Sequence, residues 1–567
     1  MAAAHDAMSG PLRAHAATPI DPVVPATFAL TGRVVTMLAQ GDVRERATVW
    51  IRDGRIVTIT DAGAPRPAGF EAVTPIATRG TIYPGLIDLH NHLPYNVLPL
   101  WQVPKRYTNR DQWGSGANPR YRPLISGPMG VLGRPEYLPA VVRYVEVKAL
   151  LGGATTTEGI KLYSDKHGGQ RYYRGIVRNV EQTDDPLLAE GATRIADVDA
   201  TSLVSFDRIV QKPKKLLLHL AEGVDATARN HFLALKLPPP GIAGREWALS
   251  PSLIGIHCAG LADADFGILA DSGTSMIWSP MSNLLLYGGT ADVAAAHRHD
   301  VTIGLGPDWS PSGSKNLLGE LKTAHAYSTL GRADALFTPY QLVSMVTSNA
   351  ARILGWQGQV GTLADTNLAD LVVVHGTTGD AYEHLIGATD ADLSLVMING
   401  VARFGLPSLV TPLLNAQVWE TITVGGKVRR LHLAHPSADP AIGTITLAQA
   451  RDLLTATLAD LPDLEHAPSA LRAGMAAARN DGRQWRLALD ELYDTGEELR
   501  PRLEYRGTRT APITDIEAAT RRAAATLPLV PVMLDPLTVA DDTTFHDRLA
   551  TQANLPPGLA AAVSALY

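Results

Sequence analysis

The feature that most constrains the fold is an alternation of strand-like and helix-like segments between residues 84 and 354. The strand-like runs are short and mostly apolar, and stretches of helical character separate them. The eight candidate strands are residues 86–90, 154–160, 175–180, 194–205, 215–221, 253–258, 275–280 and 301–306. Eight strands separated by helices over about 250 residues are what a (β/α)8 barrel, or TIM barrel, requires. The predicted fold class is therefore α/β, with this barrel over residues 84–354.

β-rich segments flank the predicted barrel on both sides. Residues 28–83 are typical of short strands, with Asp53-Gly54 placed between two of them as a hairpin turn should be. Residues 355–435 are again β-rich, so we expect the two segments to form one composite β-sandwich.

Two further segments lie outside the barrel and the predicted sandwich. Beyond residue 436, the run LAQARDLLTATLADL spaces its leucines for one helical face, and Thr514 with Glu517 matches a capping box. We therefore predict a mostly helical extension over 436–567. The Ala- and Pro-rich residues 1–27 are predicted to be a flexible N-terminus.

Composition narrows the partners and the kinds of metal site. The net charge of −6 is spread without long runs of one sign, which argues against binding to nucleic acid or to an anionic membrane surface. Cys258 is the only cysteine, so a multi-thiolate zinc cluster is excluded and any metal must be held by histidines and carboxylates. No segment has the pattern of a secretory signal or a membrane span. We expect a cytoplasmic homo-oligomer that acts on a small molecule.

Two histidines at the end of the first barrel strand have the spacing of a chelating pair. His90 and His92 are two residues apart, and the period of a strand places both imidazoles on one side, toward the barrel mouth. An isolated pair of this kind can also arise by chance. His297 and His299 have the same spacing in a helix-like segment, where such side chains diverge, so we predict a solvated helix end there.

Four more candidates follow the ends of other predicted strands. His219 ends an apolar run, where a buried imidazole needs a hydrogen bond or a metal. Glu222 is predicted to turn back toward the same cavity as a general acid/base with a pKa raised by burial; the alternative is a solvated loop residue. His257 is either a further metal ligand or a donor that holds the substrate oxygen. Asp308 is expected at the barrel rim, with helix capping as the alternative.

Aromatic residues are predicted to surround this cavity. Trp309 follows Asp308, and the long loop over residues 93–139 contains Tyr95, Trp101, Tyr107 and Trp113. They are expected either to wall the pocket under a lid or to pack the loop onto the barrel.

Seven motifs in order resemble the amidohydrolase superfamily, in the branch of cytosine, guanine and adenosylhomocysteine-type deaminases and triazine hydrolases. They are PGLIDLHNH, GATTT, HLAEG, GIHCAG, SPMSNLLL, GLGPD and SNAARILG, within residues 28–430. The resemblance implies a barrel with a composite β-sandwich and one divalent metal. It further implies that His90, His92, His219 and Asp308 are metal ligands, Glu222 a proton shuttle and His257 a group that polarises the substrate.

The chemistry of these ligands and the lysine positions bear on the metal. Three imidazoles and a carboxylate suit Zn²⁺, with Fe²⁺ as the second choice. Relatives with two metals use a carboxylated lysine on the fourth strand. Here the predicted fourth strand lies between Lys166 and Lys212, an interval without any lysine, and Lys161 lies at the end of the second predicted strand. One metal ion per chain is therefore predicted.

The predicted reaction is hydrolysis of a carbon-nitrogen bond other than a peptide bond, through a metal-activated water that Asp308 deprotonates. An amide or cyclic amide is one substrate class, and an aminated heterocycle, which would make the protein a deaminase, is the alternative. Outside the enzymes, an inactive barrel scaffold would also explain the fold. The complete set of histidines and carboxylates argues against the scaffold.

Overall fold

A computed structural model describes residues 24–113, 120–164, 169–183, 185–194, 203–415, 419–436, 438–439, 445–465, 485–489 and 527–567. Residues 1–23 of the predicted flexible N-terminus and the pair Thr514 and Glu517 lie outside the described residues.

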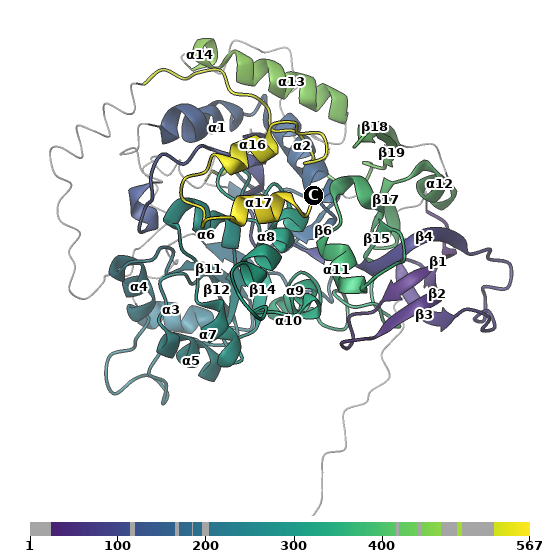
Figure 1. Cartoon of the computed structure of the whole chain (residues 1–567), viewed down its shortest axis with the longest axis horizontal. Coiled ribbons are helices and arrows are strands. Elements are labelled where there is room, and N and C mark those ends of the chain that lie inside the picture. The colour runs from purple at the N-terminus through teal and green to yellow at the C-terminus, as the bar shows by residue number, and fades with distance from the viewer. Residues whose placement is uncertain are drawn as a thin grey trace, which may run out of the picture.

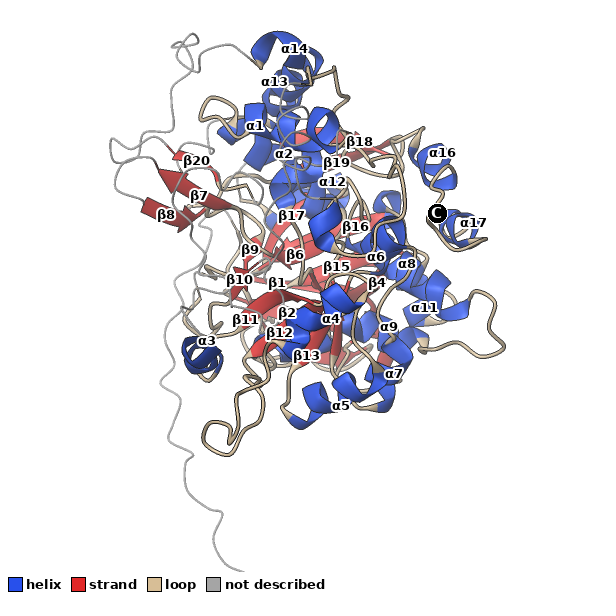
Figure 2. Cartoon of the chain, turned by 90° about the vertical axis from the view of Figure 1, so that its left-hand side faces the viewer, coloured by secondary structure: helices blue, strands red, loops and turns tan. Residues whose placement is uncertain are grey.

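Eight parallel strands form the centre of the molecule (Figures 1 and 2). They belong to a three-stranded and a five-stranded sheet: β5 (Leu86–Ile87), β6 (Ala154–Thr157) and β9 (Arg178–Asn179), then β10 (Ala192–Arg194), β11 (Leu216–Leu220), β12 (Leu253–His257), β13 (Ser275–Trp278) and β14 (Ile303–Leu305). The sheets meet on one side where Gly191 N donates to Val180 O at 2.9 Å. On the other side Asn91 and Asp308 form a parallel bridge. The predicted α/β barrel architecture agrees with this arrangement.

The fourth strand differs from its prediction. We predicted it over residues 194–205, whereas β10 covers Ala192–Arg194 and helix α3 begins at Leu203. The signal at this position is weak because β10 is only three residues long and contains polar Thr193 and Arg194.

Several helices that follow or cover the barrel strands begin at a residue whose side chain caps the helix. Asp225 and Asn316 each cap a helix, accepting hydrogen bonds from Ala228 N and Gly319 N. The helices of this region are α2 (Leu138–Leu151), α3 (Leu203–Val210), α4 (Ala226–Leu233), α5 (Asp263–Asp271), α6 (Pro280–Tyr287), α7 (Val293–Arg298), α8 (Leu317–Thr329), α9 (Pro339–Met345) and α10 (Ser348–Leu354). No helix within the described ranges is long and apolar enough to cross a membrane.

The predicted long loop over 93–139 contains short helices. They are the 3-10 helices η1 (Leu93–Val97) and η2 (Arg110–Gln112), the π-helix η3 (Arg122–Ser126) and the helix α1 (Gly127–Leu132). Prolines at the start of η1, η3 and α1 fix the backbone for a helical turn, which the loop prediction overlooked.

A nine-stranded sheet combines strands from before and after the barrel, seen as purple and green arrows side by side in Figure 1. Its early strands are β1 (Thr27–Val35), β2 (Val43–Arg52), β3 (Arg55–Asp61) and β4 (Ile76–Pro84); its late strands are β15 (Leu371–His375), β16 (Leu393–Ile398), β17 (Val401–Gly405), β18 (Glu420–Val424) and β19 (Lys427–Leu431). The two groups join where β4 pairs antiparallel with β15. Helices α11 (Ala381–Ile386) and α12 (Pro407–Val410) and the 3-10 helices η4 (Asp390–Asp392) and η5 (Thr411–Leu413) interrupt the late group.

The predicted hairpin turn is confirmed. Asp53 and Gly54 connect β2 to β3, with φ angles of 49° and 77°. Two positive φ angles are what the tight turn of a right-handed twisted hairpin needs, and Asp-Gly is a pair that adopts them readily.

The C-terminal part of the chain is not purely helical in its described ranges. Its helices are α13 (Leu447–Ala459), α14 (Leu461–Leu464), α16 (Phe545–Ala550) and α17 (Leu559–Ser564). The predicted leucine-faced helix is α13, which starts with a capping box between Thr446 and Gln449. The strand β20 (Trp485–Leu487) instead pairs with β7 (Lys161–Ser164), which also pairs with β8 (Gly169–Tyr172).

A buried charge cluster attaches the C-terminal segment to the barrel. The carboxylate of Asp535 contacts the ammonium groups of Lys148 and Lys315, the latter at 2.7 Å, and all three side chains are at most 2% exposed. Lys148 Nζ also donates to Asn96 O and Ser310 Oγ at 2.7 Å. Burial lowers the pKa of Lys148 to about 8, although Asp535 opposes this change. Lys315 Nζ also lies 3.0 Å from a carboxylate oxygen of Asp542 in the same cluster.

Replacing Asp535 by alanine is expected to lower the free energy of unfolding by about 3 to 5 kcal/mol, because a buried ammonium group loses its counter-charge. Urea unfolding followed by circular dichroism measures this change. The matched control is Asp452→Ala on α13, where the exposed carboxylate pairs with exposed Arg451, and a change within about 0.5 kcal/mol is expected. Equal stability of the two variants would contradict the role of the buried cluster.

Candidate active site

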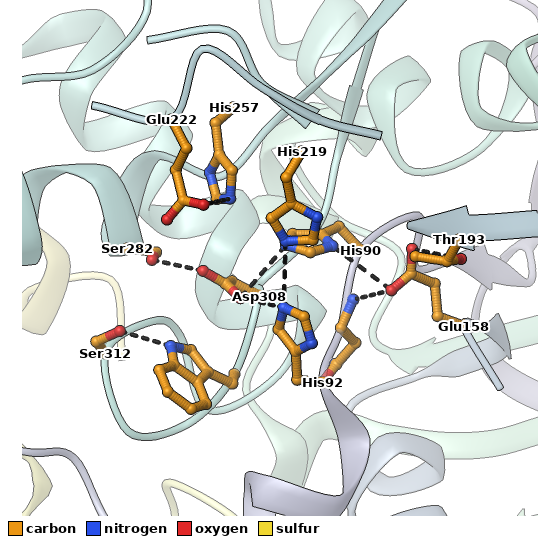
Figure 3. Close-up of polar contacts among 12 residues, drawn as sticks. His90, His92, Glu158, Thr193, His219, Glu222, His257, Ser282, Asp308 and Ser312 are labelled. Atoms are coloured by element: carbon orange, nitrogen blue, oxygen red, sulfur yellow. Dashed lines mark hydrogen bonds and ion pairs between the residues drawn. The ribbon is translucent and has the colours of Figure 1, made fainter. Parts of the chain in front are cut away.

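The structure brings the six predicted site residues together at the carboxyl ends of the barrel strands (Figure 3). Residues at these ends converge on one mouth because all eight strands run in the same direction. His90 and His92 follow β5, His219 lies in β11 with Glu222 just beyond it, His257 ends β12 and Asp308 follows β14.

Three histidines and one carboxylate surround a common point. His92 Nε2 lies 3.3 Å from His219 Nε2, and Asp308 Oδ1 lies 3.3 Å from the Nε2 atoms of both His90 and His92. The potential ligand atoms of His90, His92 and His219 all lie within 4.8 Å of one another. This arrangement of nitrogen and oxygen atoms is suited to a single small cation.

Burial of His90 provides a test of whether a cation fits. The ring is fully buried, and within the described part of the chain neither of its nitrogens makes a hydrogen bond of good geometry, although Asp308 Oδ1 and Glu158 Oε2 lie 3.3 and 3.5 Å away. Burial lowers its pKa, but Asp308 and Glu158 raise it more, to about 10. The pKa of His219, by contrast, lies well below its usual value because of burial and the neighbouring imidazoles. A divalent cation would neutralise Asp308 and give the buried nitrogens a partner, so the donor set fits a metal.

Glu222 is held by two side chains that lie far from it in the sequence. Tyr287 donates its hydroxyl hydrogen to Oε1 at 2.8 Å, and Arg110 Nη1 donates to Oε2 at 3.1 Å. Burial raises the pKa of Glu222, but His257, Arg110 and Tyr287 lower it more, so the net change is downward. The predicted upward pKa shift is therefore wrong, because the sequence does not reveal the two partners. The carboxyl group is ionised in the resting site.

His257 lies beside Glu222, and its Nε2 atom is 3.8 Å from Glu222 Oε2. Its ring is buried, and burial lowers its pKa to about 4 against the opposing effects of Glu222 and Asp308. The imidazole is therefore neutral near pH 7. Its ligand atoms also lie within 4.8 Å of those of His90 and Asp308, so the distances allow both predicted roles.

Strained backbone accompanies three turns at the barrel mouth. Ala221, His257 and Asp308 have φ angles of 51°, 67° and 68°. Such left-handed conformations cost residues with a Cβ about 1 to 3 kcal/mol each and often occur at functional sites. Here they turn the chain immediately after a strand and aim His257 and Asp308 at the pocket.

A small pocket opens over these residues, lined by His92, Arg110, Trp113, His219, Glu222, Asp308 and Trp309. Trp113 and Trp309 form its aromatic wall, with ring centroids 5.7 Å apart. Three of the predicted aromatic residues are buried outside this lining: Tyr95, Trp101 and Tyr107. Both predicted roles of the loop aromatics therefore occur, in different residues.

Several site residues were not predicted from the sequence. Glu158 Oε2 lies 3.5 Å from His90 Nδ1 and accepts a hydrogen bond from Asn91 N, and Ser282 donates to Asp308 Oδ2 at 2.6 Å. Glu158 directly follows β6, so its place at the end of a barrel strand could have revealed it. No local signal marks Arg110, which reaches Glu222 from the segment after β5.

The structure agrees with the sequence analysis on two further points, the second histidine pair and the positions of the lysines. His297 is exposed on α7 and His299 follows the helix, where it contacts Asp263 at 3.2 Å, so this pair is a solvated helix end. β10, the fourth barrel strand, contains no lysine. Lys161 begins β7, which lies in the sheet with β8 and β20 and not in the barrel.

Known proteins resemble this chain over most of their length. A family model described as the amidohydrolase family matches residues 245–403. A 5-methylthioadenosine/S-adenosylhomocysteine deaminase from Desulforudis audaxviator is 32% identical over 400 residues, which cover 62% of this chain and 88% of the relative. A protein of the same name from Symbiobacterium thermophilum is 24% identical over 399 residues, or 60% of this chain and 84% of the relative.

The fold also resembles that of solved structures. An adenosine deaminase from Xanthomonas campestris with bound zinc has a TM-score of 0.51 and 18% sequence identity, and the match covers 76% of this chain and 99% of that chain. At this level of identity the similarity concerns the fold.

Proposed function

The chain belongs to the amidohydrolase family, and from this premise we propose that it is a metal-dependent aminohydrolase that removes the amino group of a nitrogen heterocycle. It is a hydrolase of carbon-nitrogen bonds other than peptide bonds. The observation that carries the proposal is the convergence of three imidazoles and Asp308 beside Glu222 and His257. Of these groups, His92, His219, Glu222 and Asp308 line the pocket.

We propose His90, His92, His219 and Asp308 as the residues that hold one divalent metal, Zn²⁺ or else Fe²⁺. When bound there, the ion would supply a Lewis acid that makes water a nucleophile near neutral pH. We propose one ion and not two, because β10, the fourth barrel strand, lacks the lysine that relatives with two metals carboxylate.

The remaining groups can move the two protons of the attacking water. Because Glu222 is ionised at rest, its first act is to accept a proton, which it then gives to the ring nitrogen beside the attacked carbon. Asp308 takes the second proton and passes it to the exocyclic amino group, which leaves as ammonia when its bond to carbon breaks. The new carbon-oxygen bond remains in the product, and His257 faces the oxygen as it gains charge.

The relatives favour an aminated heterocycle over an amide. Both are named as deaminases of 5-methylthioadenosine and S-adenosylhomocysteine. Trp113 and Trp309 line the pocket with aromatic rings, each of which can stack on a planar base. We therefore propose a 6-aminopurine nucleoside as the first substrate class to examine.

A substrate panel tests the function. Zinc-loaded protein is incubated with adenosine, 5-methylthioadenosine, S-adenosylhomocysteine, guanine and cytosine, and separately with amides and lactams. Ammonia and acid release are measured. Ammonia from at least one aminated heterocycle is expected. Acid from lactams alone would overturn the deaminase proposal in favour of cyclic-amide hydrolysis, and inactivity throughout would favour the inactive scaffold.

We also propose that the nine-stranded sheet is the predicted composite β-sandwich of residues 28–83 and 355–435. Residues 84–354 would then form the catalytic unit and residues 436–567 an extension fastened to it through Asp535. The homo-oligomer and the cytoplasmic location stay predictions, and light scattering of the purified chain measures the first.

A further inference from the structure

A chain of hydrogen bonds extends behind His257, on the side away from the pocket. Trp278 Nε1 donates to Thr290 Oγ1 at 2.8 Å, Thr290 Oγ1 donates to Asn283 Oδ1 at 3.2 Å, and Asn283 Nδ2 lies 3.0 Å from His257 Nδ1. Trp278 ends β13, and Asn283 lies in α6. Both side chains are fully buried.

The chemistry of the first group sets the direction of the whole chain. An indole N–H can only donate, so Thr290 Oγ1 must accept from Trp278 and its own proton is available to the next acceptor. Asn283 Oδ1 accepts that proton at 3.2 Å, and this contact directs the amide NH2 toward His257. The reverse amide orientation would set NH2 against the Thr290 hydroxyl and remove the acceptor of the hydroxyl proton.

The same logic continues into the imidazole. Because the amide NH2 can only donate, His257 Nδ1 must be the acceptor and carry a lone pair. A neutral imidazole has a single N–H, which must then be on Nε2. A nitrogen that carries hydrogen offers no lone pair to a cation.

We propose that Trp278, acting through Thr290 and Asn283, holds His257 in the tautomer with its proton on Nε2, so that His257 donates a hydrogen bond into the pocket and is not a metal ligand. Trp278, Thr290 and Asn283 are thus positioning residues. As an aid to catalysis, this role rests on the proposed function.

The surroundings of His257 Nε2 are consistent with a hydrogen-bond donor whose partner is a bound ligand. The atom is buried and, among the residues that the structure describes, has no hydrogen-bond partner. Its nearest carboxylate oxygen is Glu222 Oε2 at 3.8 Å, and Glu222 is already held by Arg110 and Tyr287. A buried donor without a partner is costly, whereas it can stabilise a substrate oxygen that gains negative charge.

The tautomer can be measured without any substrate. Zinc-loaded protein labelled with ¹⁵N-histidine is studied by long-range ¹H–¹⁵N correlation, with the His257 signals assigned by their loss in His257→Gln. We expect a protonated Nε2 and an unprotonated Nδ1. A protonated Nδ1, as metal coordination through Nε2 would require, overturns the proposal.

Two variants interrupt the hydrogen-bond chain. In Trp278→Phe and in Thr290→Val, His257 is expected to show a mixture of both tautomers, while Thr290→Ser keeps the hydroxyl group and the original tautomer. The matched control is Trp356→Phe, because Trp356 is also fully buried but donates to the backbone oxygen of Ala189. An unchanged tautomer in both Trp278→Phe and Thr290→Val would overturn the relay.

Kinetics give a second readout. Thr290→Val is expected to lower kcat by about 10-fold, less than the 10²- to 10³-fold loss when a donor to a developing oxyanion is removed outright, with KM changed less than kcat. Metal content should stay constant. A lowered metal content with unchanged kcat would contradict the proposal.

The outcomes distinguish the relay from the proposed function. If the tautomer is as expected but no heterocycle is deaminated, only the proposed function fails. If the protein deaminates a heterocycle but His257 is protonated on Nδ1, only the relay is refuted.

Discussion

The double substitution His90→Ala/His92→Ala is expected to reduce bound metal from about one equivalent per chain to a trace, and hydrolysis with it. The two imidazoles supply two of the four groups that converge within the pocket, and His219 and Asp308 alone cannot enclose a cation against water. Elemental analysis after dialysis against a weak chelator measures the loss.

The chain contains its own control for this experiment. His297→Ala/His299→Ala removes the same two side chains at the same spacing from an exposed helix end, and it should keep the full metal content. Circular dichroism verifies that both variants are folded. Full metal retention by the folded His90→Ala/His92→Ala protein would refute the site.

The substitution Glu222→Gln is expected to lower kcat by about 10² to 10⁴, the usual contribution of a general acid/base. Glutamine keeps the shape of the side chain and can still accept the hydrogen bonds of Arg110 or Tyr287 at its oxygen, but it cannot carry a proton between water and a ring nitrogen. Steady-state rates on the best substrate of the panel measure the change. Metal content should remain near that of the unmodified protein.

A second glutamate controls for the loss of one negative charge. Glu190 is half-exposed and pairs loosely with Lys214 at 3.9 Å, so Glu190→Gln should leave kcat unchanged. If Glu222→Gln also retained full turnover, Glu222 would be a structural partner of Arg110 and not a proton carrier.

Much of the barrel could be predicted because its strands are short apolar runs bounded by breaks. Seven of the eight predicted runs overlap a barrel strand closely, and Asp53-Gly54 marks the hairpin by a backbone preference that is purely local. The exception is β10, whose stability comes from its neighbour β11 and not from its own composition.

The candidate metal ligands could also be anticipated, because each lies near or just beyond the carboxyl end of a strand of a parallel barrel. Such a barrel gathers these positions whatever the lengths of the intervening segments. The groups around the ligands could not be anticipated in this way. Arg110, Tyr287 and Asp535 reach their partners from segments remote in sequence, and no period or motif announces those contacts.

The pattern of the sequence by itself determined the alternation of strands and helices, the hairpin and the residue types available to a metal, because these depend on neighbours along the chain. Only the tertiary structure decided the charge of Glu222 and the direction of the hydrogen bonds behind His257. Both depend on which distant donors lie within about 3 Å of a buried atom. The pKa of Glu222 is lowered because His257, Arg110 and Tyr287 together outweigh burial. The His257 proton is placed by an indole N–H two hydrogen-bonding groups away.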